Sequence, residues 1–185
     1  MKRAIFLDRD GTIIKNKGYI CKFSEVEIFP FSIEAVKAIN NRGYLAIVVT
    51  NQSSVARGIC TEEQIGIIHD RMKRYFQKYQ ANIEKFYYCP YHRNGVIDRY
   101  RKDADCRKPS PGMILHAAKE FNIDLSKSFM IGDSTIDIEA GHRAGCKTVL
   151  VRTGGGKEAE LDLINRKIKP DYITENILSA VFICL

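Results

Sequence analysis

The segment Ala4-Ile5-Phe6-Leu7-Asp8-Arg9-Asp10-Gly11-Thr12 places an apolar run directly before two aspartates and a glycine. Four consecutive apolar residues predict a short buried strand over 4–7, because a strand that is covered on both faces is apolar throughout. Asp8 and Asp10 stand two residues apart, so their side chains lean to the same side if the strand continues through them. The segment therefore predicts a strand that delivers two carboxylates to one crevice.

The rest of the chain alternates short apolar runs with amphipathic stretches. Further strands are expected over 45–49, 85–88, 129–131 and 148–151, and helices over 32–41, 61–79, 111–121 and 134–144. Thr61 and Gln64 have the spacing of a capping box, which predicts where the longest helix begins and leaves 51–60 as a loop. This alternation predicts an α/β fold: a doubly wound, Rossmann-like parallel sheet with helices on both faces. We also expect a minimal cap and an irregular loop over 90–109, after the third strand.

Size and composition restrict the class of protein. The 185 residues, of which 45% are hydrophobic, fit one compact domain over 1–185. The formal net charge of +7 suits anionic partners, either phosphate esters or nucleic acid. There is no long apolar run and no signal-peptide pattern, so we expect neither membrane insertion nor export, but a cytoplasmic protein. In that reducing compartment the six cysteines are expected to be thiols or metal ligands rather than disulfides.

Polar residues follow three of the expected strands, and ligands of a doubly wound sheet bind beyond the carboxyl ends of its strands. The three groups are Asp8 with Asp10, Thr50 with Asn51 and Gln52, and Gly132 with Asp133. The carboxylates of Asp8, Asp10 and Asp133 suit Mg²⁺, which prefers oxygen ligands and binds beside phosphate. Lys108 adds a cation. Taken singly, these residues also fit a solvated turn, a local hydroxyl contact and a surface lysine.

Four segments in order carry a resemblance to a known superfamily. They are FLDRDGT at 6–12, VVTNQS at 48–53, CRKPSPGM at 106–113 and IGDSTIDIEAG at 131–141. Together they resemble the motifs of haloacid dehalogenase superfamily phosphatases. Within that superfamily the chain is similar, over 3–154, to the family of D-glycero-D-manno-heptose-1,7-bisphosphate 7-phosphatases, which includes histidinol-phosphate phosphatases.

The resemblance implies a role for each matching residue. Asp8 would attack phosphorus and form an aspartyl-phosphate, and Asp10 would act as the acid and base. Thr50 and Lys108 would hold the phosphoryl group. Mg²⁺ would be bound by Asp8, Asp133 and a main-chain oxygen at Asp10 or its neighbour. The substrate pocket would be lined by Asn16, Lys17, Gly18, Tyr19, Asn51, Gln52, Ser53 and Arg107.

The implied reaction is removal of the C7 phosphate from D-glycero-D-manno-heptose 1,7-bisphosphate by a monomer. Histidinol phosphate is an alternative substrate, because both reactions use the same catalytic groups. A nucleic-acid 3′-phosphatase is more distant, since it needs a basic stacking channel for single strands. Acidic residues at 98, 103 and 105 interrupt the basic segment, so we expect a small phosphorylated sugar as partner and no nucleic acid. A non-catalytic binding module would not need both Asp8 and Asp10.

The resembling phosphatases carry a structural zinc in the loop after the third strand, with the pattern Cys-Pro-His, a spacer, then Cys-x-Cys-Arg-Lys-Pro. Here Tyr91 and Ala104 occupy two of the four ligand positions, and neither can bind zinc. The remaining candidate ligands are Cys89, His92 and Cys106, with Asp103 or Asp105 as a poor fourth. A metal-free loop is the favoured expectation, and a rebuilt zinc site is the alternative.

The remaining polar features are expected to have structural roles. The glycine-rich segment 153–157 lacks the spacing of a phosphate-binding P-loop and is expected to be a turn. Asp137 is expected on a helix near the site, and Glu139 in solvent. The histidines at 69, 116 and 142 have no paired ligand spacing and are expected to be ordinary core or surface residues.

Overall fold

The apolar run at the start of the chain forms a central strand of the sheet. In the computed structural model, which describes residues 1–185, β1 (Arg3–Leu7) lies between β2 (Tyr44–Asn51) and β4 (Phe129–Gly132). The other strands are β3 (Ile83–Cys89), β5 (Lys147–Val151) and β6 (Tyr172–Thr174). The strand order is β3-β2-β1-β4-β5-β6, and all neighbours are parallel. The carboxyl ends of all six strands therefore meet at one edge of the sheet.

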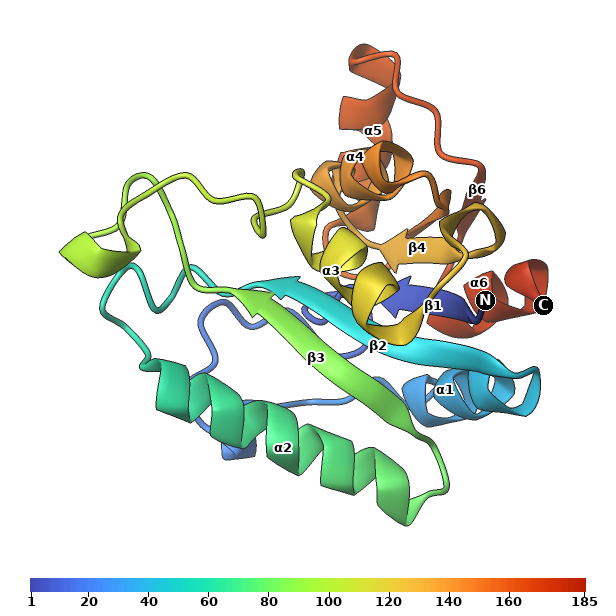
Figure 1. Ribbon diagram of the computed structural model, residues 1–185, viewed down its shortest axis with the longest axis horizontal. Coiled ribbons are helices and arrows are strands. Elements are labelled where there is room, and N and C mark those ends of the chain that lie inside the picture. Colours follow the sequence, from blue (N-terminus) through green and yellow to red (C-terminus); the bar gives the residue numbers. More distant parts are fainter.

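Helices cover both faces of this sheet (Figure 1). They are α1 (Ser32–Asn41), α2 (Glu62–Lys78), α3 (Gly112–Phe121), α4 (Thr135–Ala144), α5 (Gly156–Asn165) and α6 (Ile177–Cys184). One hydrophobic cluster joins β1 to α1, α2 and α6, and two others join the opposite face to α3, α4 and α5. The predicted doubly wound parallel fold is confirmed.

For the helices and strands up to residue 151, the bounds predicted from the sequence lie close to the observed ones. The helices and strands after residue 151 were not predicted. The predicted capping box is present, since the Gln64 main-chain N–H donates to Thr61 Oγ1 at 3.1 Å and the Thr61 N–H donates to Gln64 Oε1 at 2.8 Å. The missed elements are α5, β6 and α6. β6 has only three residues, and α6 is apolar on nearly every side, so neither contains the periodicity that identifies an amphipathic element.

Two loops extend beyond the carboxyl ends of β2 and β3 (Figure 1). As expected, residues 52–60 form turns and residues 90–109 are irregular apart from a 3₁₀ turn, Asp98–Tyr100. Two further 3₁₀ turns occur at Phe23–Glu25 and Leu125–Lys127. The hydroxyl groups of Tyr88 and Tyr100 both donate to Glu62 at the start of α2. The hydrogen bond from Tyr100 attaches the second loop to α2, the helix that follows the first loop, and the one from Tyr88 attaches the end of β3 to the same helix.

The expectation that no cysteines are paired is wrong for one pair. Cys21 and Cys60 form a disulfide with their Cα atoms 5.4 Å apart, although 39 positions separate them in the sequence. The fold brings together the loop after β1 and the loop after β2, a proximity that cysteine spacing along the chain does not reveal. The other four cysteines are thiols.

The expectation that Glu139 is solvated is also wrong. Only 8% of this residue is exposed, and its carboxylate pairs with Arg143 at 2.7 Å and with Arg166. The partner from beyond α5 could not be anticipated, because that helix was not predicted.

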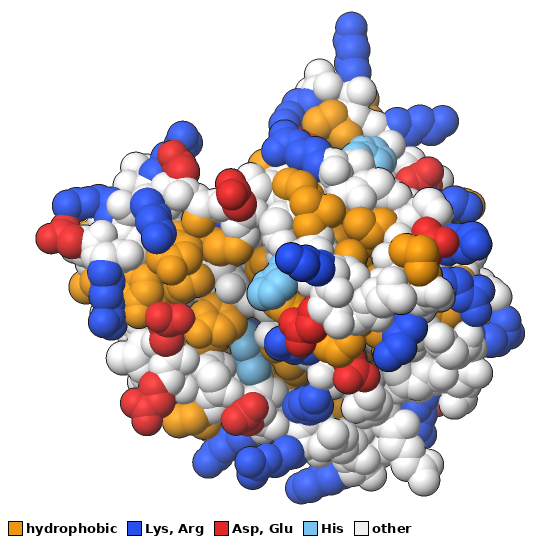
Figure 2. Space-filling view, in the orientation of Figure 1, with side chains coloured by type: hydrophobic (Ala, Val, Ile, Leu, Met, Phe, Trp, Pro, Cys, Tyr) orange, Lys and Arg blue, Asp and Glu red, His pale blue; other side chains and the backbone are white.

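No helix of the protein combines the length and apolar composition needed to cross a bilayer. Figure 2 shows Lys and Arg side chains spread over one face of the molecule and interleaved with Asp and Glu.

Candidate active site

A cavity of about 270 Å³ lies beyond the carboxyl ends of β1, β2 and β4, where the topology predicted a ligand site. It brings together residues from five separate segments of the chain. They are Asp8, Asp10, Asn16, Thr50, Asn51, Lys108, Asp133, Ser134, Ile136, Asp137 and Gly155. All four predicted catalytic residues and all three predicted magnesium ligands border this cavity.

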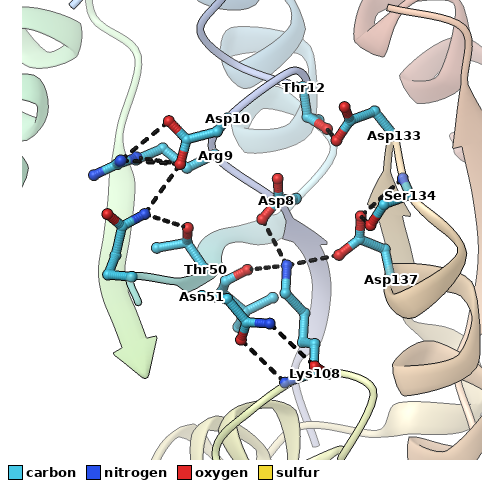
Figure 3. A network of polar contacts seen from close by, with 12 residues as sticks. Asp8, Arg9, Asp10, Thr12, Thr50, Asn51, Lys108, Asp133, Ser134 and Asp137 are labelled. Atoms are coloured by element: carbon cyan, nitrogen blue, oxygen red, sulfur yellow. Dashed lines mark hydrogen bonds and ion pairs between the residues drawn. The ribbon is translucent and has the colours of Figure 1, made fainter. Parts of the chain in front are cut away.

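Lys108 occupies the centre of the polar network (Figure 3). Its Nζ atom lies 2.6 Å from Asp8 Oδ1, 2.6 Å from Asp137 Oδ1 and 2.8 Å from the carbonyl oxygen of Val49. Burial by itself would lower the pKa of Lys108, but the charges of Asp137 and Asp8 outweigh burial and raise the pKa above its ordinary value. The lysine is 3% exposed, so the surface-lysine alternative does not apply.

Asn51 fixes the main chain that carries this lysine. Its side-chain amide donates to the carbonyl oxygen of Lys108 at 3.0 Å, and its Oδ1 accepts the Lys108 N–H at 3.0 Å. The end of β2 therefore holds the loop before α3 by a two-point contact. This contact defines where the lysine side chain enters the cavity.

Three buried carboxylates form a cluster suited to a divalent cation. Oxygen atoms of Asp8, Asp133 and Asp137 all lie within 4.8 Å of one another. Burial, partly offset by the Lys108 charge, raises the pKa of Asp8 well above its ordinary value, with the neighbouring carboxylates adding to the rise. Burial and the charge of Asp137 raise the pKa of Asp133 to about 7. An all-oxygen donor set in which the ionised forms of Asp8 and Asp133 are disfavoured fits Mg²⁺, because the cation removes the repulsion between the carboxylates.

Glycines surround the Asp133 carboxylate. The Gly155 N–H donates to Asp133 Oδ2 at 2.8 Å. A Cβ atom on Gly11 or on Gly154 would overlap the same oxygen, and both glycines have positive φ angles, which L side chains rarely adopt. The glycine-rich turn, expected only to be a turn, therefore also positions a carboxylate of the candidate metal site.

Asp10 differs from the other carboxylates in its orientation. Its side chain points toward Arg9, on the opposite side of Asp8 from Asp133 and Asp137 (Figure 3). Arg9 donates through Nε and Nη2 to the two Asp10 oxygens at 3.0 Å each, and Gln52 Nε2 donates to Oδ2 at 3.0 Å. The third carboxylate beside Asp8 and Asp133 therefore belongs to Asp137 and not to Asp10. Asp10 remains a predicted magnesium ligand through its main-chain oxygen only.

The predicted substrate residues divide between the cavity and its surroundings. Thr50 is buried and accepts a hydrogen bond from Gln52 Nε2 at 2.9 Å, and Ser53 follows Gln52 in the turn. Asn16 lines the cavity and accepts the Gly18 N–H at 3.1 Å. The next positions point outward: Lys17 pairs with Glu27 at 2.8 Å, and Tyr19 is 51% exposed.

Arg107 borders a second cavity of about 460 Å³, which shares Lys108 with the first. This second cavity is lined by His92, Arg93, Asp103, Ala104, Arg107, Lys108, Pro109, Ser110 and Ile136. Arg107 Nη1 donates to the carbonyl oxygen of Tyr91 at 3.1 Å, and burial together with the nearby charge of Arg57 lowers the pKa of Arg107. A cationic cavity therefore adjoins the carboxylate site.

The altered zinc loop retains two adjacent sulfur atoms. Cys106 Sγ donates to Cys89 Sγ at 2.6 Å, and this contact lowers the pKa of Cys89. His92, the expected substitute ligand, instead accepts the Asn94 N–H at its Nδ1 atom, at 3.0 Å. The only group of three candidate ligands in the chain is the carboxylate cluster.

Sequence reasoning missed the part that Asp137 plays at the centre of the site. Ser134 Oγ and the Ser134 N–H donate to Asp137 Oδ2 at 2.6 and 3.1 Å, which fixes the carboxylate at the start of α4. The spacing Ser134-x-x-Asp137 is that of a capping box and could have placed the residue at a helix end. Its contact with Lys108 spans 29 positions and had no local signal.

Similarity to known proteins agrees with this site. A family model described as HAD-hydrolase-like matches residues 105–180. The chain is 45% identical over 155 residues to D-glycero-beta-D-manno-heptose-1,7-bisphosphate 7-phosphatase of Pasteurella multocida, covering 83% of this chain and 84% of that protein. It is 36% identical over 185 residues to D-glycero-D-manno-heptose-1,7-bisphosphate 7-phosphatase of Chlorobaculum tepidum, covering 97% and 92%. The crystal structure of D,D-heptose 1,7-bisphosphate phosphatase from B. bronchiseptica, complexed with magnesium and phosphate, has a TM-score of 0.84 at 28% identity, covering 98% of this chain and 97% of that one.

Proposed function

We propose that this chain, which belongs to the D-glycero-D-manno-heptose-1,7-bisphosphate 7-phosphatase family of haloacid-dehalogenase-like hydrolases, removes the C7 phosphate of a heptose 1,7-bisphosphate. The observation that carries the proposal is the buried pair of Asp8 and Lys108, with Asp133 beside it, at the carboxyl end of β1. A carboxylate is a competent nucleophile toward phosphorus when cations neutralise the phosphoryl oxygens.

In the first step an oxygen of Asp8 forms a bond to phosphorus, and the bond from phosphorus to the C7 oxygen breaks. Lys108 holds Asp8 Oδ1 at 2.6 Å, so rotation of the carboxylate is fixed and its second oxygen remains for attack. The leaving oxygen takes a proton from Asp10. The product of this step is an aspartyl-phosphate and the free C7 hydroxyl.

In the second step Asp10 removes a proton from water, whose oxygen bonds to phosphorus as the bond from phosphorus to Asp8 breaks. One acid-base group serves both steps because the proton that it gives in the first is replaced in the second. Lys108 and Thr50 hold the phosphoryl oxygens. Asp8, Asp133 and the main-chain oxygen of Asp10 would hold Mg²⁺, with Asp137 within reach, and the bound ion would supply neutralising charge at the phosphoryl group.

The cationic cavity beside Lys108 supports a substrate with two phosphates. Arg107 can make a forked contact with a phosphate that does not react, and Arg93 and His92 lie in the same cavity. Histidinol phosphate has a single phosphate and would leave this cavity without an anion. The bisphosphate is therefore the favoured substrate over the histidine precursor.

A turnover panel tests the assignment. Heptose 1,7-bisphosphate, histidinol phosphate, fructose bisphosphate and a 3′-phosphorylated oligonucleotide are compared by kcat/KM with Mg²⁺ present. The heptose bisphosphate should give the highest value. A higher kcat/KM for histidinol phosphate would reassign the substrate, and preference for the oligonucleotide would place the enzyme among nucleic-acid phosphatases.

We further propose that the loop with Cys89 and Cys106 functions without zinc. Losing two of four ligands should remove most of the roughly 10–16 kcal/mol that a structural zinc site contributes. Elemental analysis of the dialysed protein should give far less than one zinc per chain. A ratio near one that Cys89→Ser abolishes would show that the site has been rebuilt.

The proposal includes a cytoplasmic monomer. Light scattering during gel filtration should give a mass near the 21.1 kDa of one chain. A mass near twice that value would contradict the monomer.

A further inference from the structure

Arg9 lies between the two aspartates of the first motif and is among the most deeply buried side chains, with 1% exposure. Its Nε and Nη2 atoms both donate to the Asp10 carboxylate, and its Nη1 atom lies 3.1 Å from Nε2 of His69. A buried guanidinium needs acceptors for its N–H groups, because a donor without a partner loses its hydration and gains nothing in return. His69 supplies the acceptor on the side away from Asp10.

His69 is held in a fixed orientation on α2. Its ring stacks on Phe86 of β3 with centroids 4.7 Å apart and meets the ring of Tyr88 at 5.6 Å. Since a guanidinium only donates, Nε2 must carry the lone pair, and the ring must be neutral with its proton on Nδ1. Burial, followed by the Arg9 charge, lowers the pKa of His69, which agrees with a neutral ring.

We infer that His69 is a positioning residue for the hydrolytic step, acting through Arg9 on Asp10. With Nη1 anchored by His69, the opposite edge of the planar guanidinium presents two N–H groups to the two oxygens of Asp10. That contact fixes the plane of the Asp10 carboxylate, and a base needs a fixed orientation when it removes a proton from water. The inference rests on the proposed role of Asp10.

The rival explanation is that His69 only fills space between α2 and β3. The two explanations differ in which step they affect. A structural defect would slow phosphoryl transfer to Asp8 and hydrolysis of the aspartyl-phosphate alike. A misplaced Asp10 would slow hydrolysis, while transfer from an ester with a good leaving group, which needs no proton, would continue.

The experiment uses p-nitrophenyl phosphate with rapid mixing, and compares the first turnover with the steady state. His69→Phe keeps the aromatic stacking and removes the acceptor. It should release the first equivalent of nitrophenol within about threefold of the wild-type rate, while the steady-state rate falls at least about tenfold. Acid quenching should then recover phosphate bound to the protein. His69→Gln, whose amide oxygen can accept from Arg9, should restore the steady-state rate to within about threefold.

Two controls separate the possible failures. Met72→Leu, at another buried position on α2, should change neither rate constant, and Asp10→Asn should retain phosphate on the protein as His69→Phe does. If His69→Phe lowers the rate of the first turnover and the steady-state rate equally, or lowers neither, the inference is overturned. The proposed mechanism then still stands, provided that Asp10→Asn retains phosphate on the protein. If Asp10→Asn retains no phosphate, the mechanism itself fails and the inference with it. Should the Phe variant not fold, His69→Met removes the acceptor with a flexible side chain and is compared with His69→Gln in the same way.

Discussion

Asp8 is the residue on which covalent catalysis depends. Asp8→Asn should lower kcat by at least about a thousandfold, equivalent to about 4 kcal/mol, because an amide is not a nucleophile toward phosphorus. The fold should persist, since Lys108 keeps Asp137 and the Val49 carbonyl oxygen as partners, and the unfolding free energy should change by less than about 2 kcal/mol. Steady-state kinetics and urea unfolding measure the two effects.

The control for this substitution is Asp70→Asn, on the exposed side of α2, which should leave kcat unchanged. A variant at Asp8 that retained more than about a tenth of wild-type kcat, a loss below about 1.4 kcal/mol, would exclude this residue as the nucleophile.

Arg107 should determine selectivity rather than the rate of chemistry. Arg107→Ala should raise KM for a sugar bisphosphate about tenfold or more and leave kcat/KM for p-nitrophenyl phosphate within about threefold, since only the bisphosphate loses a remote contact. Arg101→Ala, an exposed arginine in the same loop, is the matched control and should affect neither substrate. Equal losses on both substrates would place Arg107 at the reacting phosphate.

At the scale of elements, the disulfide between Cys21 and Cys60 joins the loop after β1, which carries the cavity residue Asn16, to the loop after β2. It closes a segment with a sequence separation of 39, for which chain-entropy arguments give about 4 kcal/mol of stabilisation. Cys21→Ser should lower the unfolding free energy by about that amount and raise KM, because the loop that carries Asn16 loses its attachment. Urea unfolding and steady-state kinetics provide the measurements.

Thiol titration checks the disulfide independently. Under denaturing conditions without a reductant, four of the six cysteines should react. The double variant Cys21→Ser with Cys60→Ser should be no less stable than the less stable of the two single variants, because each of the three variants loses the same disulfide bond. Six reactive thiols in the unreduced protein would contradict the disulfide.

The elements that the sequence predicted and those that it missed differ in how local their signals are. The strand that ends at Asp8 and the helix that starts at Thr61 have their apolar pattern and capping residues within a few positions. The parallel topology then forces the strand ends together, which explains why Asp8, Thr50 and Asp133 were placed in one site. The contacts of Arg9 with His69 and of Cys21 with Cys60 join segments whose proximity is known only from the fold.

For the molecule as a whole, the carboxylate cluster couples stability to pH and to magnesium. The pKa of Asp133 is raised from 3.8 to about 7, so the folded state holds a proton that the unfolded chain releases between these values. The resulting stabilisation is complete below about pH 4 and is lost as the pH rises through about 7, and Asp8 shifts in the same direction. In chelator, this contribution to the unfolding free energy should therefore decline over that range.

Magnesium should reverse that trend because it binds the ionised carboxylates. The difference in unfolding free energy between Mg²⁺ and chelator should grow with pH and reach about 2.7 kcal/mol at a hundredfold excess over the dissociation constant. Urea unfolding from about pH 5 to pH 8 measures it, and Asp133→Asn should flatten the dependence. A difference that does not vary with pH would contradict the assignment of these carboxylates.

The central position of β1 has a consequence for how the protein is made. β1 is synthesised before β4, which pairs with it through residues 129–131, and before Lys108, the lysine that pairs with both Asp8 and Asp137. A nascent chain that has emerged only as far as α2 can pair β1 with β2, but the other edge of β1 stays open and apolar. Such an edge can recruit other chains. Ribosomes that stall before Lys108 would therefore release a fragment that has the nucleophile, lacks the lysine that holds it, and depends on chaperones or proteases for its removal.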